Sequence, residues 1–144
     1  ATKMGDVTQI EKVEEDYFIH TGSPHYVRYV KNLDDVDVYT EGKAIRNADA
    51  YKLEGTNVNF VSVHQDHLKV RTYERGVEDE TLSCGTGVTA VAISFLLQMN
   101  SEDSSVNIAT RGGNLRIELK RTEPNKFENI WLIGPAKEVF SGEV

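Results

Sequence analysis

The sequence predicts one α/β (α+β) domain in which a curled, largely antiparallel sheet or barrel wraps around a central buried helix. Three observations lead to this fold class. Many short segments carry the alternation and flanking turn residues of strands, and one helical segment is apolar on nearly all sides. The length of 144 residues suits an ordinary single domain. No repeat or interdomain linker is visible, so we expect a single domain over residues 1–144.

The first half of the chain is expected to contain five strands and one helix. Polar turns at 14–15 and 22–24 separate the first three strands, and the tight link 65–67 joins the last two. A helix is expected from residue 36 to about 50, with Val38, Ala44, Ile45 and Ala48 on its apolar face, although Gly42 lowers its helix propensity. The predicted strands are 7–13, 16–21, 25–31, 57–64 and 68–73. In the last of these, Leu68, Val70 and Thr72 are expected on the buried face, and Lys69, Arg71 and Tyr73 on the solvent side.

The second half is expected to contain the buried helix and an antiparallel meander. The helix is predicted over about 88–99, where apolar residues cover most of the circumference, so other elements must surround it. Gly112-Gly113 is a strong hairpin signal, and Leu115, Ile117 and Leu119 alternate strictly with charged residues. The predicted strands are 106–111, 114–120, 127–133 and 136–140.

Composition excludes several classes of partner. Sixteen basic and twenty-three acidic residues leave a formal charge of −7 without a basic cluster, so nucleic acid and an anionic membrane are not expected as partners. The single cysteine excludes an internal disulfide framework. No signal-peptide pattern opens the chain, and its longest uncharged stretch has too short an apolar part to span a bilayer. We therefore expect a cytoplasmic protein.

The single cysteine, Cys84, stands directly before Gly85-Thr86-Gly87 and the apolar helix. A thiolate is favoured there by the helix dipole and by free backbone N–H groups. The same N–H groups can hold a carboxylate or a phosphate. A reactive sulfur beside an anion site suits chemistry at the α-carbon of an amino acid. The alternatives are a cysteine that serves as a small buried hydrophobe and glycines that form a simple tight turn.

Glu74 and Arg75 lie where a predicted strand ends, so their side chains are expected to project in different directions. An arginine fork can bind a carboxylate and a glutamate can accept from an ammonium group. The alternative is a solvated charge pair that contributes under about 1 kcal/mol.

Two further residues open predicted strands. His25 follows the turn 22–24, and Asn57 follows Gly55-Thr56. The alternatives to a role in a site are ordinary packing for His25 and turn chemistry for Asn57 and the nearby Asn59. His64 and His67 lack a third ligand at metal spacing, so no metal site is expected.

Taken together, the run Thr72-Tyr73-Glu74-Arg75-Gly76 and the run from Glu80 to Gly87 resemble diaminopimelate epimerase. The similarity continues through Gly22-Ser23-Pro24-His25, through 55–60 and through Gly134-Pro135-Ala136, and so covers essentially the whole chain. The resemblance implies an isomerase that interconverts LL- and meso-diaminopimelate without pyridoxal phosphate or another cofactor, in lysine biosynthesis. It also implies a fold of two similar halves, each a curled sheet around a helix, with the active site between them.

By this likeness the chain corresponds to the second half only. Cys84 would be one of two catalytic cysteines, and Gly85 and Thr86 would bind the substrate α-carboxylate through their amides. Glu74 and Arg75 would contact the reacting amino-acid head. Asn57 would bind substrate, and His25 would line the site near the sulfurs.

Two departures from the family pattern matter. Ser23 stands where many relatives carry asparagine, and the cysteine-glycine motif of the first half is absent from this sequence. Inversion needs one group to take a proton from one face of the α-carbon and another to deliver a proton to the opposite face. Cys84 serves one face only, so the chain alone is expected to be catalytically incomplete.

Partners and rival functions follow from this. The surface that would meet the N-terminal half-domain is expected to be exposed, which predicts association with that half or as a homodimer. A racemase or epimerase of another amino acid is one alternative function. A non-catalytic binding or assembly module that retains the anion-binding turn is the other.

Overall fold

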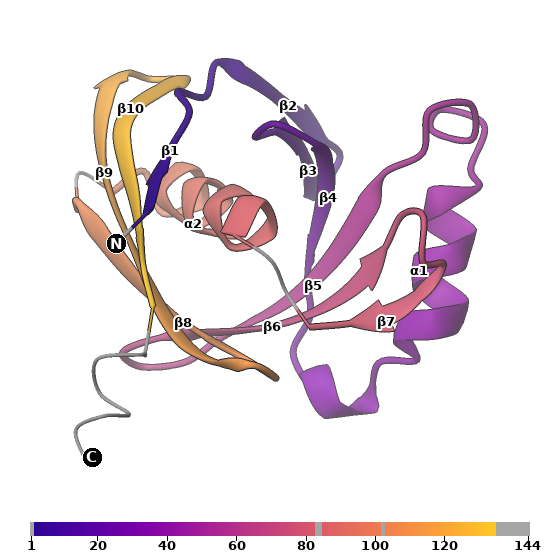
Figure 1. The fold of residues 1–144 in the computed structure, drawn as a ribbon. Helices are drawn as coiled ribbons and strands as arrows, with labels where there is room; N and C mark the ends of the chain where they lie inside the picture. Colours follow the sequence, from indigo (N-terminus) through magenta and orange to yellow (C-terminus); the bar gives the residue numbers. More distant parts are fainter. Residues whose placement is uncertain (1, 83–84, 102, 135–144) are drawn as a thin grey trace.

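A computed structural model of the chain describes residues 2–82, 85–101 and 103–134 (Figure 1). Within these ranges the strands are β1 (Thr2–Met4), β2 (Gln9–Val13), β3 (Asp16–His20), β4 (Pro24–Tyr29), β5 (Asn57–Val63), β6 (Leu68–Glu74), β7 (Asp79–Thr81), β8 (Ser105–Thr110), β9 (Gly113–Glu123) and β10 (Lys126–Ile133). The helices are the short 3-10 helix η1 (Leu33–Asp35) and the α-helices α1 (Val38–Arg46) and α2 (Gly85–Gln98).

The ten strands form one curled sheet. Its order is β1-β10-β9-β8-β6-β5-β4-β3-β2, and β7 pairs with β6 beside this path. Among these strands only the β4–β5 and β6–β8 pairs are parallel. The Val7 and Phe127 backbones exchange hydrogen bonds of 2.9 and 3.0 Å, which join the segment before β2 to β10. The predicted curled, largely antiparallel sheet is therefore confirmed.

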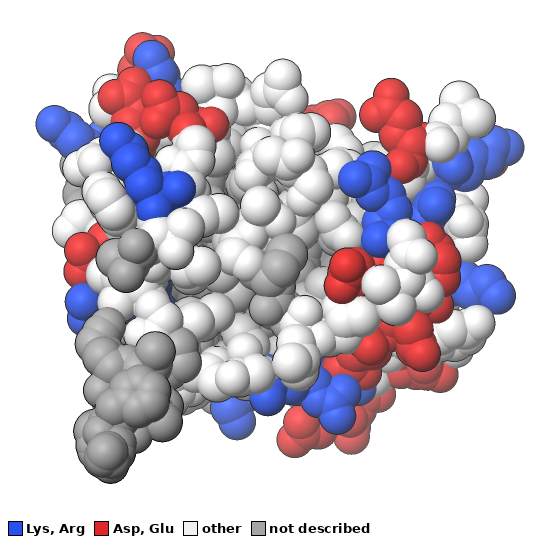
Figure 2. All heavy atoms as spheres, viewed as in Figure 1, with Lys and Arg blue, Asp and Glu red and all other residues white. Residues whose placement is uncertain are grey.

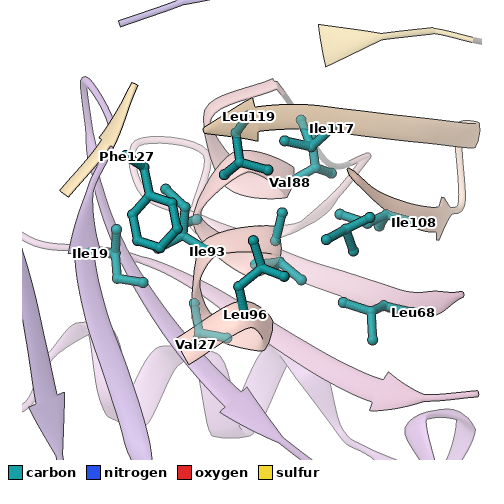
Figure 3. Close-up of a cluster of buried hydrophobic side chains, with 14 of the residues drawn as sticks. Ile19, Val27, Leu68, Val88, Ile93, Leu96, Ile108, Ile117, Leu119 and Phe127 are labelled. Atoms are coloured by element: carbon teal, nitrogen blue, oxygen red, sulfur yellow. The ribbon is translucent and has the colours of Figure 1, made fainter. Parts of the chain in front are cut away.

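The helix α2 lies inside this curl and is buried on all sides (Figure 1). Every residue from 87 to 94 is buried, as its apolar sequence predicts. Its side chains share one cluster with the strands on both sides; the strand residues labelled in Figure 3 are Ile19, Val27, Leu68, Ile108, Ile117, Leu119 and Phe127. Burial of each such side chain contributes roughly 1.5–3 kcal/mol, so helix and sheet stabilise one another.

The helix α1 packs against the opposite face of β5 and β6 (Figure 1). A second apolar cluster forms there around Val38, Phe60 and Tyr73. Because helices cover both faces of β5, every residue of this strand except Val63 is buried. The centre of the sheet is therefore packed between α2 on one face and α1 on the other.

The helix predicted over 36–50 is shorter in the structure. Asp37 caps its start, because its side chain accepts a hydrogen bond of 3.1 Å from the Thr40 amide. Ala44, predicted on the apolar face, is exposed. Gly42 is buried instead: an added Cβ would lie 2.5 Å from the Cβ of Tyr73, so glycine lets α1 approach β6 closely.

Three other local predictions were wrong. Tyr73, expected on the solvent side of β6, is buried under α1. The β8–β9 hairpin turns one residue earlier than predicted, because Thr110 pairs with Gly113 and the loop is Arg111-Gly112. The helix α2 begins at Gly85, three residues before its predicted start. Strands β1 and β7 went unpredicted because three residues are too few to show a period.

The strand predicted over 136–140 lies outside the described residues. In the ranges that the structure describes, no helix has the length and apolar character needed to cross a membrane.

The close approach of α1 to β6 gives a stability prediction. Gly42→Ala should lower the free energy of unfolding by roughly 1–3 kcal/mol, the usual range for overpacking, although alanine is the better helix former by about 1 kcal/mol. The added methyl would meet the Cβ of Tyr73, which cannot rotate away. Gly5→Ala is the control, because no atom lies within 4 Å of its added Cβ. Urea denaturation that finds both variants equally stable would contradict this account.

Candidate active site

The chain topology gathers four segment ends at one edge of the sheet. Strands β4 and β5 are parallel and start there, and the antiparallel β6 ends there, at Glu74. The first turn of α2 lies at the same edge, since Thr86 Oγ1 is 3.0 Å from His25 Nε2 on β4. The predicted residues His25, Asn57, Glu74 and Thr86 are therefore brought together although they are distant in sequence.

His25 is the most deeply buried titratable group of this edge, with no exposed surface. Its Nε2 atom lies 3.1 Å from Ser23 Oγ and 3.0 Å from Thr86 Oγ1. Its Nδ1 atom lies 3.1 Å from Asn59 Nδ2. His25 therefore lies beside the first turn of α2, and its role in the site stays a prediction.

The imidazole of His25 is neutral at physiological pH. Burial, with smaller contributions from His20 and Arg75, lowers the pKa of His25 from 6.5 to about 3. A neutral imidazole has one N–H donor and one bare acceptor nitrogen. It can therefore direct a hydrogen bond without introducing a positive charge.

Asn57 uses its side-chain amide to join two segments of the site. Its Nδ2 donates to the Pro24 carbonyl at 3.0 Å, and its Oδ1 accepts from the Arg75 backbone amide at 2.9 Å. The side chain is 8% exposed. Asn57 therefore holds the turn that carries Arg75 against the start of β4.

Glu74 and Arg75 make separate contacts. Glu74 Oε1 accepts from Thr81 Oγ1 at 2.8 Å, and Arg75 Nη1 donates to the Glu54 carbonyl at 2.9 Å. The two side chains therefore point to different segments, as the sequence predicts. Within the part of the chain that the structure describes, neither has an ion-pair partner of opposite charge. Both charges are thus available to a zwitterion.

The glycines at the start of α2 permit close packing. A Cβ on Gly87 would lie 3.2 Å from Asn59 Oδ1 and 3.3 Å from His25 Cε1. A Cβ on Gly85 would lie 2.9 Å from Leu132 Cδ2. Both residues belong to the first turn of the helix, so close approach, and not a simple tight turn, explains them.

Thr86 is held in place by the turn before β4. Its carbonyl accepts a hydrogen bond of 2.8 Å from Thr21 Oγ1, and its hydroxyl lies 3.3 Å from Ser23 Oγ. Cys84, the central residue of the predicted site, lies outside the described residues. In the sequence it directly precedes Gly85.

The face that includes this edge has few charges at its centre. In Figure 2 the middle of the view is mostly white, the colour of residues other than Lys, Arg, Asp and Glu. The charged residues gather toward the margins and over α1. Met4 and Leu132, which pack beside Gly85, are partly buried residues. Leu82, at the end of the described range 2–82, is 62% exposed.

Asn59 and Thr72 are two members of the site that were not predicted from the sequence. Asn59 has no exposed surface; it bonds His25 and also accepts from Thr72 Oγ1 at 3.0 Å. The signal was present in β5, where asparagine recurs at alternate positions of a buried, mainly apolar strand. Alternate positions share one face of a strand, so both point to the side that carries His25.

Solved structures share this fold at low identity. The chain superposes on a phenazine biosynthesis protein of the PhzF family from Enterococcus faecalis with a TM-score of 0.53 and 16% identity, over 85% of this chain and 42% of that one. A probable proline racemase from Agrobacterium radiobacter K84 gives a TM-score of 0.50 and 14% identity, over 87% and 39%. These similarities show that the chain shares the fold of these proteins.

Sequence comparison identifies the family. Residues 17–139 match the family model described as diaminopimelate epimerase, and the chain belongs to that family. It is 43% identical over 141 residues to the diaminopimelate epimerase of Flavobacterium psychrophilum, covering 96% of this chain and 54% of the relative. It is 44% identical over 129 residues to that of Aquifex aeolicus, covering 88% and 45%. The chain spans about half the length of the curated relatives it matches.

The buried neutral histidine gives a pH prediction. The pKa of His25 is lower in the folded chain than the unfolded value of 6.5, so the unfolded chain binds more protons below pH 6.5. The contribution of neutral His25 to the free energy of unfolding is therefore fully present above pH 6.5 and is lost as the pH falls below that value. Between pH 7 and pH 5 this linkage should remove about 2 kcal/mol of the free energy of unfolding.

The measurement is urea unfolding at both pH values. His25→Gln should lack this part of the pH dependence, because glutamine does not titrate. Val27→Ala, on the same strand, is the control: it removes core volume but should keep the full difference between the two pH values. Equal pH dependence in the histidine variant and the unaltered chain would show that His25 is already accessible to protons.

Proposed function

We propose that this chain is the half of a diaminopimelate epimerase that supplies Cys84, one of two proton-transferring cysteines in the interconversion of LL- and meso-diaminopimelate. The observation that carries the proposal is the placement of neutral His25 at 3.0 Å from Thr86, in the turn that directly follows Cys84. Membership of the family supports the choice of reaction.

The first turn of α2 is suited to bind the substrate α-carboxylate. The N–H groups at the start of a helix lack intrahelical partners and carry the positive end of the dipole. Gly85 and Thr86 would supply these donors, and the contacts of Thr86 with Thr21 and His25 hold the turn against β4. In the proposal, the carboxylate binds here with the α-carbon close to Cys84.

The remaining charges of a zwitterion have counterparts at the same edge. Arg75 would bind a carboxylate oxygen and Glu74 would accept from the α-ammonium group. Neither charge is consumed by an ion pair with a described residue, and Asn57 holds the Arg75 backbone at 2.9 Å. Asn57 would thus act on the substrate through this turn, in addition to any direct contact.

The proposed chemistry needs no cofactor. In one direction Cys84, as thiolate, would remove the α-proton from one face, and a thiol on the opposite face would deliver a proton as the carbanion forms. In the other direction the roles exchange. The negative charge that develops on the carboxylate is stabilised by the fixed N–H dipoles of α2 and by Arg75.

The opposite thiol would come from an N-terminal half-domain. The chain spans 54% of the Flavobacterium psychrophilum relative and 45% of the Aquifex aeolicus relative, which leaves room for a second domain of similar size. The weakly charged centre of the face in Figure 2 supports a contact on this side. A homodimer and a cytoplasmic location remain predictions from the sequence.

Identity favours diaminopimelate over another amino acid. Several curated relatives with this name are 42–44% identical to the chain, whereas the similarity to the probable proline racemase is 14% and concerns the fold alone. The specificity for the substrate side chain would depend partly on the other half of the enzyme. The assay should therefore include both diaminopimelate and proline.

The decisive test uses the complete enzyme, with both halves. Cys84→Ala should lower kcat for inversion at least about a hundredfold, because general acid–base groups contribute 10²–10⁴-fold. Chiral chromatography of LL- and meso-diaminopimelate measures the rate. Ser105→Ala, at an exposed position of β8, is the matched control and should keep the wild-type rate. Wild-type turnover by the Cys84 variant would reject the role of this sulfur.

A second prediction concerns the 144-residue chain by itself. It should not convert LL- into meso-diaminopimelate, since one sulfur serves one face of the α-carbon. Addition of the separately produced N-terminal half should restore turnover. Conversion by the isolated chain at the rate of the complete enzyme would mean that the second proton donor lies within this sequence.

A further inference from the structure

A row of polar side chains crosses the inner face of the sheet, next to the apolar core. It consists of His25 on β4, Asn59 on β5 and Thr72 on β6; Asn59 stands directly opposite Thr72 in the β5–β6 pair. His25 and Asn59 have no exposed surface, and Thr72 is 4% exposed. Two residues further along the same strands, the same face carries Val61 and Val70, which belong to the apolar core. Polar groups in such a place are costly unless they are hydrogen-bonded.

The hydrogen-bond partners of Asn59 determine which way its amide faces. The Tyr26 carbonyl, which can only accept, lies 3.4 Å from Nδ2, and Thr72 Oγ1 donates to Oδ1 at 3.0 Å. The amide N–H groups therefore face Tyr26 and His25. With Nδ2 at 3.1 Å from His25 Nδ1, the histidine nitrogen on this side must be the bare acceptor.

We propose that Asn59 is a positioning residue that fixes His25 in its Nε2–H tautomer, so that the ring donates its hydrogen to the hydroxyls of Ser23 and Thr86. These two hydroxyl oxygens lie 3.1 and 3.0 Å from Nε2. Thr72 assists by holding the Asn59 amide in its orientation. The value of this arrangement for catalysis rests on the function proposed above.

The tautomer decides what the first turn of α2 offers to an anion. When Nε2 donates, the hydroxyl oxygens accept from the ring and their own hydrogens bond other acceptors, of which an anion at the helix start is one. The opposite tautomer would make Nε2 an acceptor and draw a hydroxyl hydrogen toward the ring. Hydrogen bonds that all donate in the direction from the sheet to α2 polarise and strengthen one another. This arrangement favours a carboxylate at the first turn of α2.

The tautomer is measured by two-bond 1H–15N correlation spectra of the imidazole rings in the full chain at pH 7. We expect a protonated Nε2 and a bare Nδ1 for His25. Asn59→Asp replaces the N–H donor by a carboxylate that only accepts, and should place a proton on Nδ1. The other three histidines, His20, His64 and His67, make no contact with Asn59 and serve as internal controls. A proton on Nδ1 in the unaltered chain would overturn the proposal.

A second pair of variants keeps the test valid if Asn59→Asp does not fold. Thr72→Ser retains the hydroxyl that donates to Asn59 Oδ1 and should keep the Nε2–H pattern. Thr72→Val has nearly the same shape but lacks the donor, and should give a mixture of tautomers. An unchanged Nε2–H pattern in Thr72→Val and in folded Asn59→Asp would show that His25 takes this tautomer without their help.

Activity of the complete enzyme separates this inference from the proposed function. A variant whose tautomer has changed should lose about 10- to 100-fold in kcat/KM, the effect of one hydrogen bond to a charged group. Wild-type kcat/KM in such a variant would overturn the positioning role. If the complete unaltered enzyme inverts no diaminopimelate, the proposed function is wrong, while the spectra still decide the tautomer.

Discussion

The burial of α2 on all sides is the constraint on which the rest of this structure depends. A helix without a polar face needs cover around its whole circumference, and the sheet supplies it by curling until the Val7 and Phe127 backbones meet. This curl sets the positions of the strand ends. Because β4 and β5 pack against α2 and β6 pairs with β5, the edge where β4 and β5 start and β6 ends lies beside the first turn of the helix.

The polar side chains of the site are a local exception to this apolar packing. His25, Asn59 and Thr72 face the same helix as the valines of the core, yet each has a hydrogen-bond partner. Their burial removes water from around the imidazole, which is the main reason for the low pKa of His25. The dry interior that stabilises the fold also determines the protonation state of the site.

The second helix, α1, stabilises the site from the other side of the sheet. It covers the outer face of β5 and β6 and packs on Tyr73, the residue before Glu74. The backbone that carries Glu74 and Arg75 is thus held between two packed layers, while Asn57 bonds the Arg75 amide. Rigid support of this kind suits residues that must meet a zwitterion in one geometry.

The fold class and the buried helix could be predicted from the sequence because both depend on local periods of apolar residues, and the candidate site was predicted from the run of residues around Cys84. Ala44 and Tyr73 were predicted on the wrong faces, since the contact between α1 and β6 joins residues about thirty positions apart. The sequence also left Asn59 among turn residues. Only the tertiary structure decided that His25 is neutral and reaches Thr86, 61 positions away. Burial and the parallel register of β4 with β5 arise from long-range packing, which no local pattern of residues encodes.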